Sequence, residues 1–139
     1  MLVVVLLPGG HQARSVPAAV AAVADYAQAV PPPAGDQHHV SGGRAAPVQV
    51  GRPVTVTAGG QRMVLRVWQL GRVEAVVAVS AQPFPMPAPA HGVTSGGMAW
   101  TARLGTISLY CRNGHTSELV AAPVPETQLA VLAAQLPPA

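Results

Sequence analysis

The chain has 139 residues, of which half are apolar and only 9% are charged, so its composition excludes disorder throughout and allows one domain with a single core. The net charge of +3 comes from eight arginines scattered along the chain, without any lysine. Nucleic-acid binding needs clustered cations among stacking aromatics, and aromatics make up only 4% of the chain, so no nucleic-acid partner is expected. The single cysteine excludes an intrachain disulfide.

The N-terminal segment, MLVVVLLPGG, places six apolar residues after Met1 and stops at Pro8. This run is too short for a membrane helix, which needs about 20 apolar residues, and it lacks the positive region of a signal peptide. Two interpretations stay open for residues 1–7. They form a short buried strand or frayed apolar end, or they are the outer end of a membrane helix whose first part is absent from this chain.

Residues 16–30, VPAAVAAVADYAQAV, are typical of a helix, because Pro17 suits a first turn and Val20, Val23, Ala27 and Val30 follow at helical spacing. Three prolines close this helix. Residues 31–47 are too rich in Pro, Gly and Ser for regular structure, so we expect a loop there.

Two alternating segments follow, at 53–58 and 61–70, and then a near-continuous apolar run at 73–80 that is typical of a central strand. The short glycine turns between the three segments predict an antiparallel meander. Within 61–70 the apolar side chains at odd positions share one face. Arg62, Arg66 and Trp68 lie on the opposite face, where they either bind an anion or a planar group or form an ordinary half-exposed sheet face.

The segment AQPFPMPAPAHG, residues 81–92, interrupts the sheet because its alternating prolines favour polyproline II and cannot pair in a β-ladder. Phe84 and Met86, with Trp100 further along the chain, offer an apolar recognition surface. Alternatively, the segment is a stiff crossover that packs its one phenylalanine on the sheet.

Residues 97–112 predict a further hairpin around Leu104-Gly105, and Asn113-Gly114 predicts a type I′ turn into a last strand near 116–122. That turn would pair His115 with Arg112. It would also set Glu118 opposite Leu109, so the register of the last strand stays open: either it slips or the strand begins later. Cys111 alternates in phase with Ile107 and Leu109, which indicates a buried thiol of low reactivity with a raised pKa.

The last segment, ETQLAVLAAQL at 126–136, places Leu129, Leu132 and Leu136 at the spacing of an amphipathic helix. The order of elements predicts an α+β domain, with an antiparallel β meander of about five or six strands. An N-terminal and a C-terminal helix would both pack on one face of this sheet.

Chemical motifs are scarce. The five acidic residues are spread one to each element or loop, and no motif for catalysis or phosphate binding is present. His38-His39 is the best metal candidate, but neighbouring side chains point apart in an extended chain, so we interpret it as a solvent-exposed polar pair. We predict no catalytic, cofactor-binding or metal-binding residue, and no cofactor.

A set of short elements in the C-terminal half resembles the extracytoplasmic domain of actinobacterial zinc-finger-type membrane anti-sigma factors. The resemblance covers residues 48–136 and rests on AVVAVS (75–80), PFPMP (83–87), GMAW (97–100), GTISLYC (105–111), TSELVAAPVP (116–125) and ETQLAVLAAQL (126–136). In that family a helical segment and a small β-rich domain follow a single membrane span.

The resemblance implies a division of the chain. Residues 1–15 would contain the end of a membrane helix, provided that the chain extends upstream, followed by a linker. Residues 16–30 would form a juxtamembrane helix and residues 31–47 a loop. Residues 48–139 would form the β-rich domain with its C-terminal helix. The cytoplasmic zinc-binding half of such regulators is absent from this chain, so a sigma factor would be a partner only through that missing domain. No site residue carries over from the family.

We therefore expect a non-enzymatic extracytoplasmic sensor or interaction domain that relays an envelope signal to transcription, with an envelope ligand or protein as partner. The alternative is a free-standing small-ligand binding protein or enzyme that uses the Arg66/Trp68 face or the Phe84/Trp100 loop. The candidate ligand or partner surface consists of Arg62, Arg66, Trp68, Phe84, Met86 and Trp100.

Overall fold

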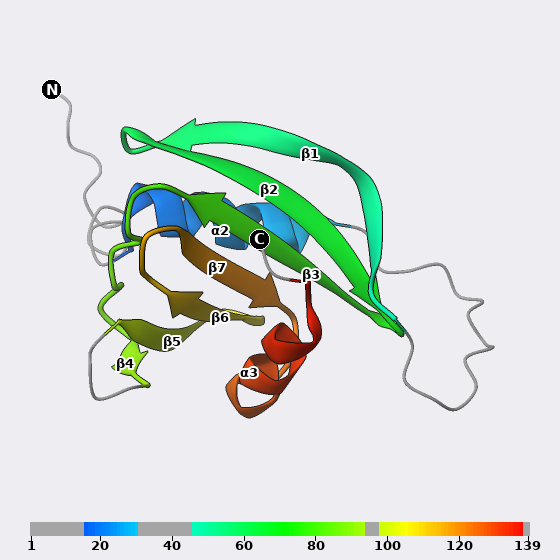
Figure 1. Ribbon diagram of the computed structural model, residues 1–139. Coiled ribbons are helices and arrows are strands. Elements are labelled where there is room, and N and C mark those ends of the chain that lie inside the picture. Colours follow the sequence, from blue (N-terminus) through cyan, green and yellow to red (C-terminus); the bar gives the residue numbers. More distant parts are fainter. Residues whose placement is uncertain (1–15, 31–45, 94–97, 138–139) are drawn as a thin grey trace, which may run out of the picture.

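The computed structural model describes residues 16–30, 46–93 and 98–137 (Figure 1). The helices among them are α2 (Ala18–Ala29) and α3 (Glu126–Gln135). The expected α+β class is confirmed, because the strands form one antiparallel sheet with a helix at each end of the chain order. The strands are β1 (Val48–Ala58), β2 (Gln61–Leu70), β3 (Val73–Ser80), β4 (His91–Gly92), β5 (Ala99–Leu104), β6 (Ile107–Arg112) and β7 (Ser117–Ala122).

The sheet consists of two meanders that meet in its middle. Its strand order is β1-β2-β3-β7-β6-β5-β4, so β3 pairs with β7 and not with the strand that follows it in the chain. The proline-rich crossover after β3 carries the chain to the far edge, and the second meander returns to β3 (Figure 1). Strand β4 was not predicted, because two residues are too few to show a period.

The glycine turns predicted between strands are confirmed. Ala58 pairs with Gln61, and both intervening residues, Gly59 and Gly60, have positive φ as a type I′ turn requires. Gly71 and Gly105 each occupy the first position of a two-residue turn, also with positive φ. Glycine adopts this conformation without the steric penalty of a side chain, so these turns set the strand registers locally.

The two helices pack on opposite faces of the sheet, not on one face as the sequence pattern suggested. Along β3 the side chains alternate, so Val76 and Ala78 join the cluster under α2, whereas Ala75 and Val77 join the cluster under α3. A strand in the middle of the sheet is apolar on both sides because both sides are covered. The near-continuous apolar run at 75–79 is the sequence signal of that double burial.

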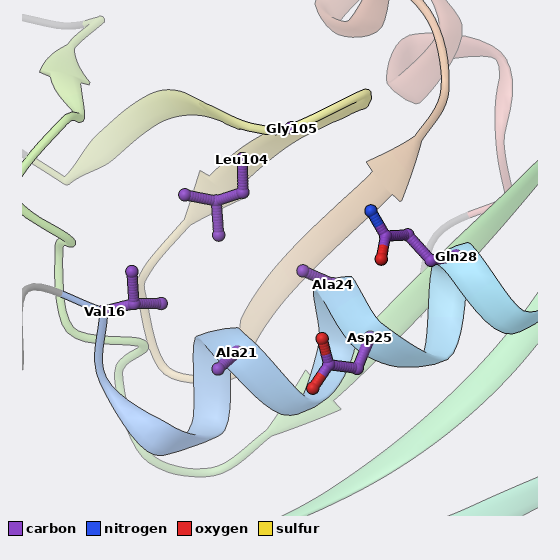
Figure 2. A pocket seen from close by; sticks show the side chains of 7 residues that line it. All are labelled: Val16, Ala21, Ala24, Asp25, Gln28, Leu104 and Gly105. Atoms are coloured by element: carbon purple, nitrogen blue, oxygen red, sulfur yellow. The ribbon is translucent and has the colours of Figure 1, made fainter. Parts of the chain in front are cut away.

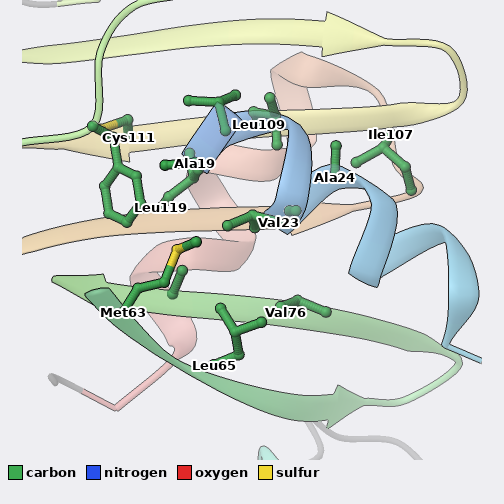
Figure 3. Packing of buried hydrophobic residues seen from close by; sticks show 14 of the residues in the cluster. Ala19, Val23, Ala24, Met63, Leu65, Val76, Ile107, Leu109, Cys111 and Leu119 are labelled. Carbon is green, nitrogen blue, oxygen red and sulfur yellow. The ribbon is translucent and has the colours of Figure 1, made fainter. Parts of the chain in front are cut away.

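The larger core lies between α2 and the sheet (Figure 3). Val20 and Val23 of α2 are fully buried against side chains from five strands. The main sheet residues of this cluster are Met63, Leu65, Val76, Trp100, Leu109, Cys111 and Leu119. The smaller core lies under α3 and is centred on Leu129 and Val120.

The connection between β6 and β7 differs from the predicted type I′ turn. Arg112 pairs with Glu118 and Cys111 pairs with Leu119, so the connecting loop is longer than Asn113-Gly114 and His115 does not pair with Arg112. The register puts the carboxylate of Glu118 2.6 Å from the Arg112 guanidinium. Asn113 does not turn the chain; its side chain binds the proline-rich crossover instead.

Candidate functional site

The six residues that the sequence analysis predicted as a ligand or partner surface do not lie on one surface. Arg62, Arg66 and Trp68 point to the α3 side of β2, whereas Phe84 and Trp100 lie in the core on the α2 side. Only 1% of Phe84 and 1% of Trp100 is exposed, so these side chains offer no contact area to a ligand. Met86, two residues from Phe84, is 48% exposed.

The buried aromatic residues hold the crossover to the sheet. The Trp100 indole Nε1–H donates to the backbone carbonyl of Phe84 at 3.3 Å. The carboxamide of Asn113 accepts from the Phe84 N–H at 2.9 Å and donates to the Phe84 carbonyl at 3.3 Å. Because a proline flanks Phe84 on each side, this residue carries the backbone N–H that can anchor the segment here. Phe84 and Trp100 therefore serve to pack the crossover on the sheet and do not form an exposed recognition surface.

Cys111 belongs to the same core. Its side chain is buried, and its thiol donates to Asn113 Oδ1 at 3.3 Å. Burial raises the pKa of the Cys111 thiol to about 12, with a smaller opposing effect from a backbone hydrogen bond to Phe84. At neutral pH it is a neutral thiol and packs as a small apolar residue, as its alternation with Leu109 predicted.

One half of one sheet face is open among the described residues. Helix α3 lies over β5, β6 and β7, so on its side of the sheet the β1–β2 hairpin and the adjoining part of β3 have no helix above them (Figure 1). We call this surface the open half-face. Its residues are Thr55, Thr57, Arg62, Val64, Arg66, Trp68 and Val79. Trp68 and Val79 form its border, because both are half-buried against the cluster under α3.

The open half-face carries positive charge. Within the described ranges neither Arg62 nor Arg66 makes a salt bridge, and the one ion pair found there joins Arg112 to Glu118. Glu118 lies next to Val79 on the same side of the sheet, but its carboxylate is neutralised by Arg112. Arg62 is exposed and Arg66 is half-buried, and neither guanidinium group has a carboxylate partner among the described residues.

A hollow of about 460 Å³ lies at the Arg62 end of the open half-face. Arg62, Val64 and Val79 line it from the sheet, and Thr116 lines it from the loop before β7. Ser80 also lines the hollow, and its hydroxyl donates to the Arg62 carbonyl at 2.9 Å and accepts from Gln61 at 3.1 Å. These bonds tie the backbone of Arg62 to β3.

A second hollow, of about 330 Å³, lies between α2 and the turn from β5 to β6 (Figure 2). Ala21, Ala24 and Leu104 form most of its wall, and the side chains of Asp25 and Gln28 are its polar groups. One carboxylate and one carboxamide give little basis for catalysis or for selective binding, so the open half-face is the stronger candidate.

The sequence pattern nominated only part of this surface. Arg62, Arg66 and Trp68 were found, whereas Thr55 and Thr57 of β1 were missed as site residues. Their alternation with Val54 and Val56 already places them on the opposite face from those valines. The register then shows which residue of β2 each threonine lies beside. Thr57 lies directly opposite Arg62, and Thr55 opposite Val64.

Among the described residues, Oε1 of Glu74 is the one buried side-chain nitrogen or oxygen atom without a hydrogen-bond partner. It lies on the α2 side of β3, opposite Gln69 of β2, so it is not part of the open half-face. Burial raises the pKa of the Glu74 carboxyl above its ordinary value. A raised pKa means that folding favours the protonated form, so the contribution of Glu74 to stability is full at acid pH and is lost as the pH rises through its folded pKa.

We expect Glu74→Gln to raise the free energy of unfolding at pH 7 by about 0.5 kcal/mol, a small effect because part of the carboxyl remains in solvent. Urea unfolding at pH 7 and near pH 4 checks this, and the gain should vanish at the lower pH. Glu118→Gln is the control, because that carboxylate is paired and its loss should destabilise the protein at pH 7. A gain for Glu74→Gln that is equal at both pH values would contradict the assignment.

No group of three His, Cys, Asp or Glu side chains that could hold a metal occurs in residues 16–30, 46–93 and 98–137. His38 and His39 lie outside the described residues, as do the N-terminal apolar segment and most of the 31–47 loop. Neither helix in the described part of the chain is long and apolar enough to cross a bilayer. No family model, curated protein or solved structure matches this chain.

Proposed function

We propose that this chain is a non-enzymatic sensor or interaction domain that binds its partner through the open half-face. The observation that carries the proposal is the pair of guanidinium groups, Arg62 and Arg66, on a sheet face that no described helix covers. Trp68 at one end adds aromatic area, and the threonines of β1 add hydroxyl groups. Arginine and tryptophan are the residue types that contribute most to protein interfaces.

The resemblance to anti-sigma factor domains supports an extracytoplasmic place for this domain, as part of a membrane-anchored regulator of transcription. In this proposal, partner binding on the β1–β2 hairpin is relayed through α2 to the residues before it. The close approach of the two elements supports this route: a Cβ built on Gly59, in the turn of that hairpin, would come within 3.0 Å of the Cβ of Ala18 at the start of α2. A shift of the hairpin would therefore press on α2.

The experiment that tests this function is gene deletion followed by complementation with matched variants. Deletion should change the transcript levels of a defined set of genes, and the intact wild-type gene should restore them. The double variant R62Q/R66Q should fail to restore them. R72Q/R103Q, which removes the same charge from the β2–β3 turn and from β5, should restore them.

Location is checked with alkaline phosphatase fused after Ala139, since this reporter is active only outside the cytoplasm. An inactive but stably expressed fusion would overturn the extracytoplasmic placement.

Circular dichroism of the purified variants R62Q/R66Q and R72Q/R103Q shows whether both keep the fold. An unchanged transcript profile in the deletion strain, or restoration by R62Q/R66Q, would refute the sensor function through this surface.

A further inference from the structure

The side chains of β2 on the open half-face follow a fixed alternation. Arg62, Val64, Arg66 and Trp68 stand at every second residue of one strand, so the order is basic, apolar, basic, aromatic. At roughly 3.4 Å per residue, the two arginine positions are about 14 Å apart along the strand. Val64 lies between them, opposite Thr55 of β1 and Val79 of β3.

Charge decides what kind of molecule fits this surface. Two described carboxylates on the α3 side of the sheet already have partners of their own: Glu118 pairs with Arg112, and Glu126 accepts a hydrogen bond from Thr101. Outside the described residues the chain has only one more acid, Asp36, which cannot match two separated guanidinium groups. A second copy docking face to face would bring arginines against arginines, which is unfavourable. The complement must be an acidic partner of another kind.

Geometry decides the shape of that partner. In an extended chain, side chains on one face repeat every two residues, at the same spacing as along β2. Acids at positions i and i+4 of an extended segment therefore match Arg62 and Arg66, and an apolar residue at i+2 meets Val64. In a helix, positions on one face recur at i+7 and i+11, about 10 and 16 Å along the axis, so the extended segment matches the spacing of the two arginines better.

We propose that the open half-face binds an extended acidic segment of a partner protein, with acids at i and i+4 and apolar residues at i+2 and i+6. The last apolar residue lies against Trp68. This inference rests on the proposed function and names the partner of that same surface. The contacts are exposed ion pairs around an apolar centre, so binding is moderate in strength and weakens with salt.

Two synthetic peptides of one composition test the pattern. Fluorescein-labelled ETVTETVT has the proposed spacing, and EETTVVTT has its acids side by side. Fluorescence anisotropy at low and physiological ionic strength measures their affinities for the full chain. The fluorescence of Trp68 reports contact directly, because the second tryptophan, Trp100, is buried.

We expect ETVTETVT to bind at least about 3-fold more tightly than EETTVVTT and to weaken at higher salt. R62Q/R66Q should weaken it by roughly 3- to 10-fold, in keeping with two exposed ion pairs, and R72Q/R103Q by less than about 2-fold. Equal affinity for the two peptides, or no binding of either, overturns the inference. So does heparin that binds the same surface more tightly and displaces the peptide, since the partner would then be a polysaccharide.

The peptide result and the complementation result separate the two proposals. If R62Q/R66Q fails to restore transcription and the peptides do not bind, the surface functions with another partner and only the present inference falls. If R62Q/R66Q restores transcription fully, the proposed function falls, whatever the peptides do.

Discussion

Replacing Phe84 with alanine is expected to lower the free energy of unfolding by about 3 to 5 kcal/mol, the range for removing a large buried aromatic side chain. Phe84 is the only phenylalanine in the chain and is 1% exposed, packed in the core under α2. The ring packs in the same cluster as Trp100 and Met63, so its removal leaves a cavity in the middle of close-packed side chains. The substitution also loosens the crossover that places the second meander.

Urea unfolding followed by circular dichroism measures this change. Met86→Ala is the matched control, because Met86 lies in the same proline-rich segment but is 48% exposed. Its substitution should change the free energy of unfolding by no more than about 0.5 kcal/mol. A cost below about 1 kcal/mol for Phe84→Ala would show that the ring is not the anchor of the crossover.

The second large effect is expected for Asn113→Ala, which should lower the free energy of unfolding by about 2 to 3 kcal/mol. The carboxamide of Asn113 satisfies both backbone groups of Phe84, and it also accepts from the Cys111 thiol. Its removal leaves the Phe84 N–H with only the weak sulfur acceptor of Cys111, and a buried donor that loses its good acceptor costs about 1–3 kcal/mol. Trp100 still donates to the Phe84 carbonyl, which limits the loss.

Hydrogen exchange of the Phe84 amide is the specific measurement for this prediction. The exchange rate should rise at least about tenfold in Asn113→Ala, since the hydrogen bond that protects the amide is gone. The combined variant with Phe84→Ala should cost less than the sum of the single changes, because both act on the same anchor. Full additivity, with Phe84 amide exchange unchanged, would show that Asn113 acts elsewhere.

These anchoring contacts also mark what sequence reasoning missed. The Asn-Gly pair at 113–114 is a strong signal for a two-residue turn, and the structure uses Asn113 otherwise. The competing interaction comes from Phe84, which lies 29 positions earlier in the chain. A local pattern carries no information about such a partner. The open half-face differs in part, because the Gly59-Gly60 turn sets Thr57 opposite Arg62 locally, whereas the position of α3 over β5, β6 and β7 depends on distant parts of the chain.

The sequence by itself determined the local elements: α2 and α3, the long strands, the glycine turns, and the inward side of Cys111. Each follows from residue propensity, side-chain period or the backbone freedom of glycine, which act over a few neighbouring residues. Only the tertiary structure decided that β3 pairs with β7, that the helices cover opposite faces, and that Arg62 and Arg66 are left uncovered. Those features depend on how apolar faces far apart in the chain bury one another, and that is a property of the whole sheet.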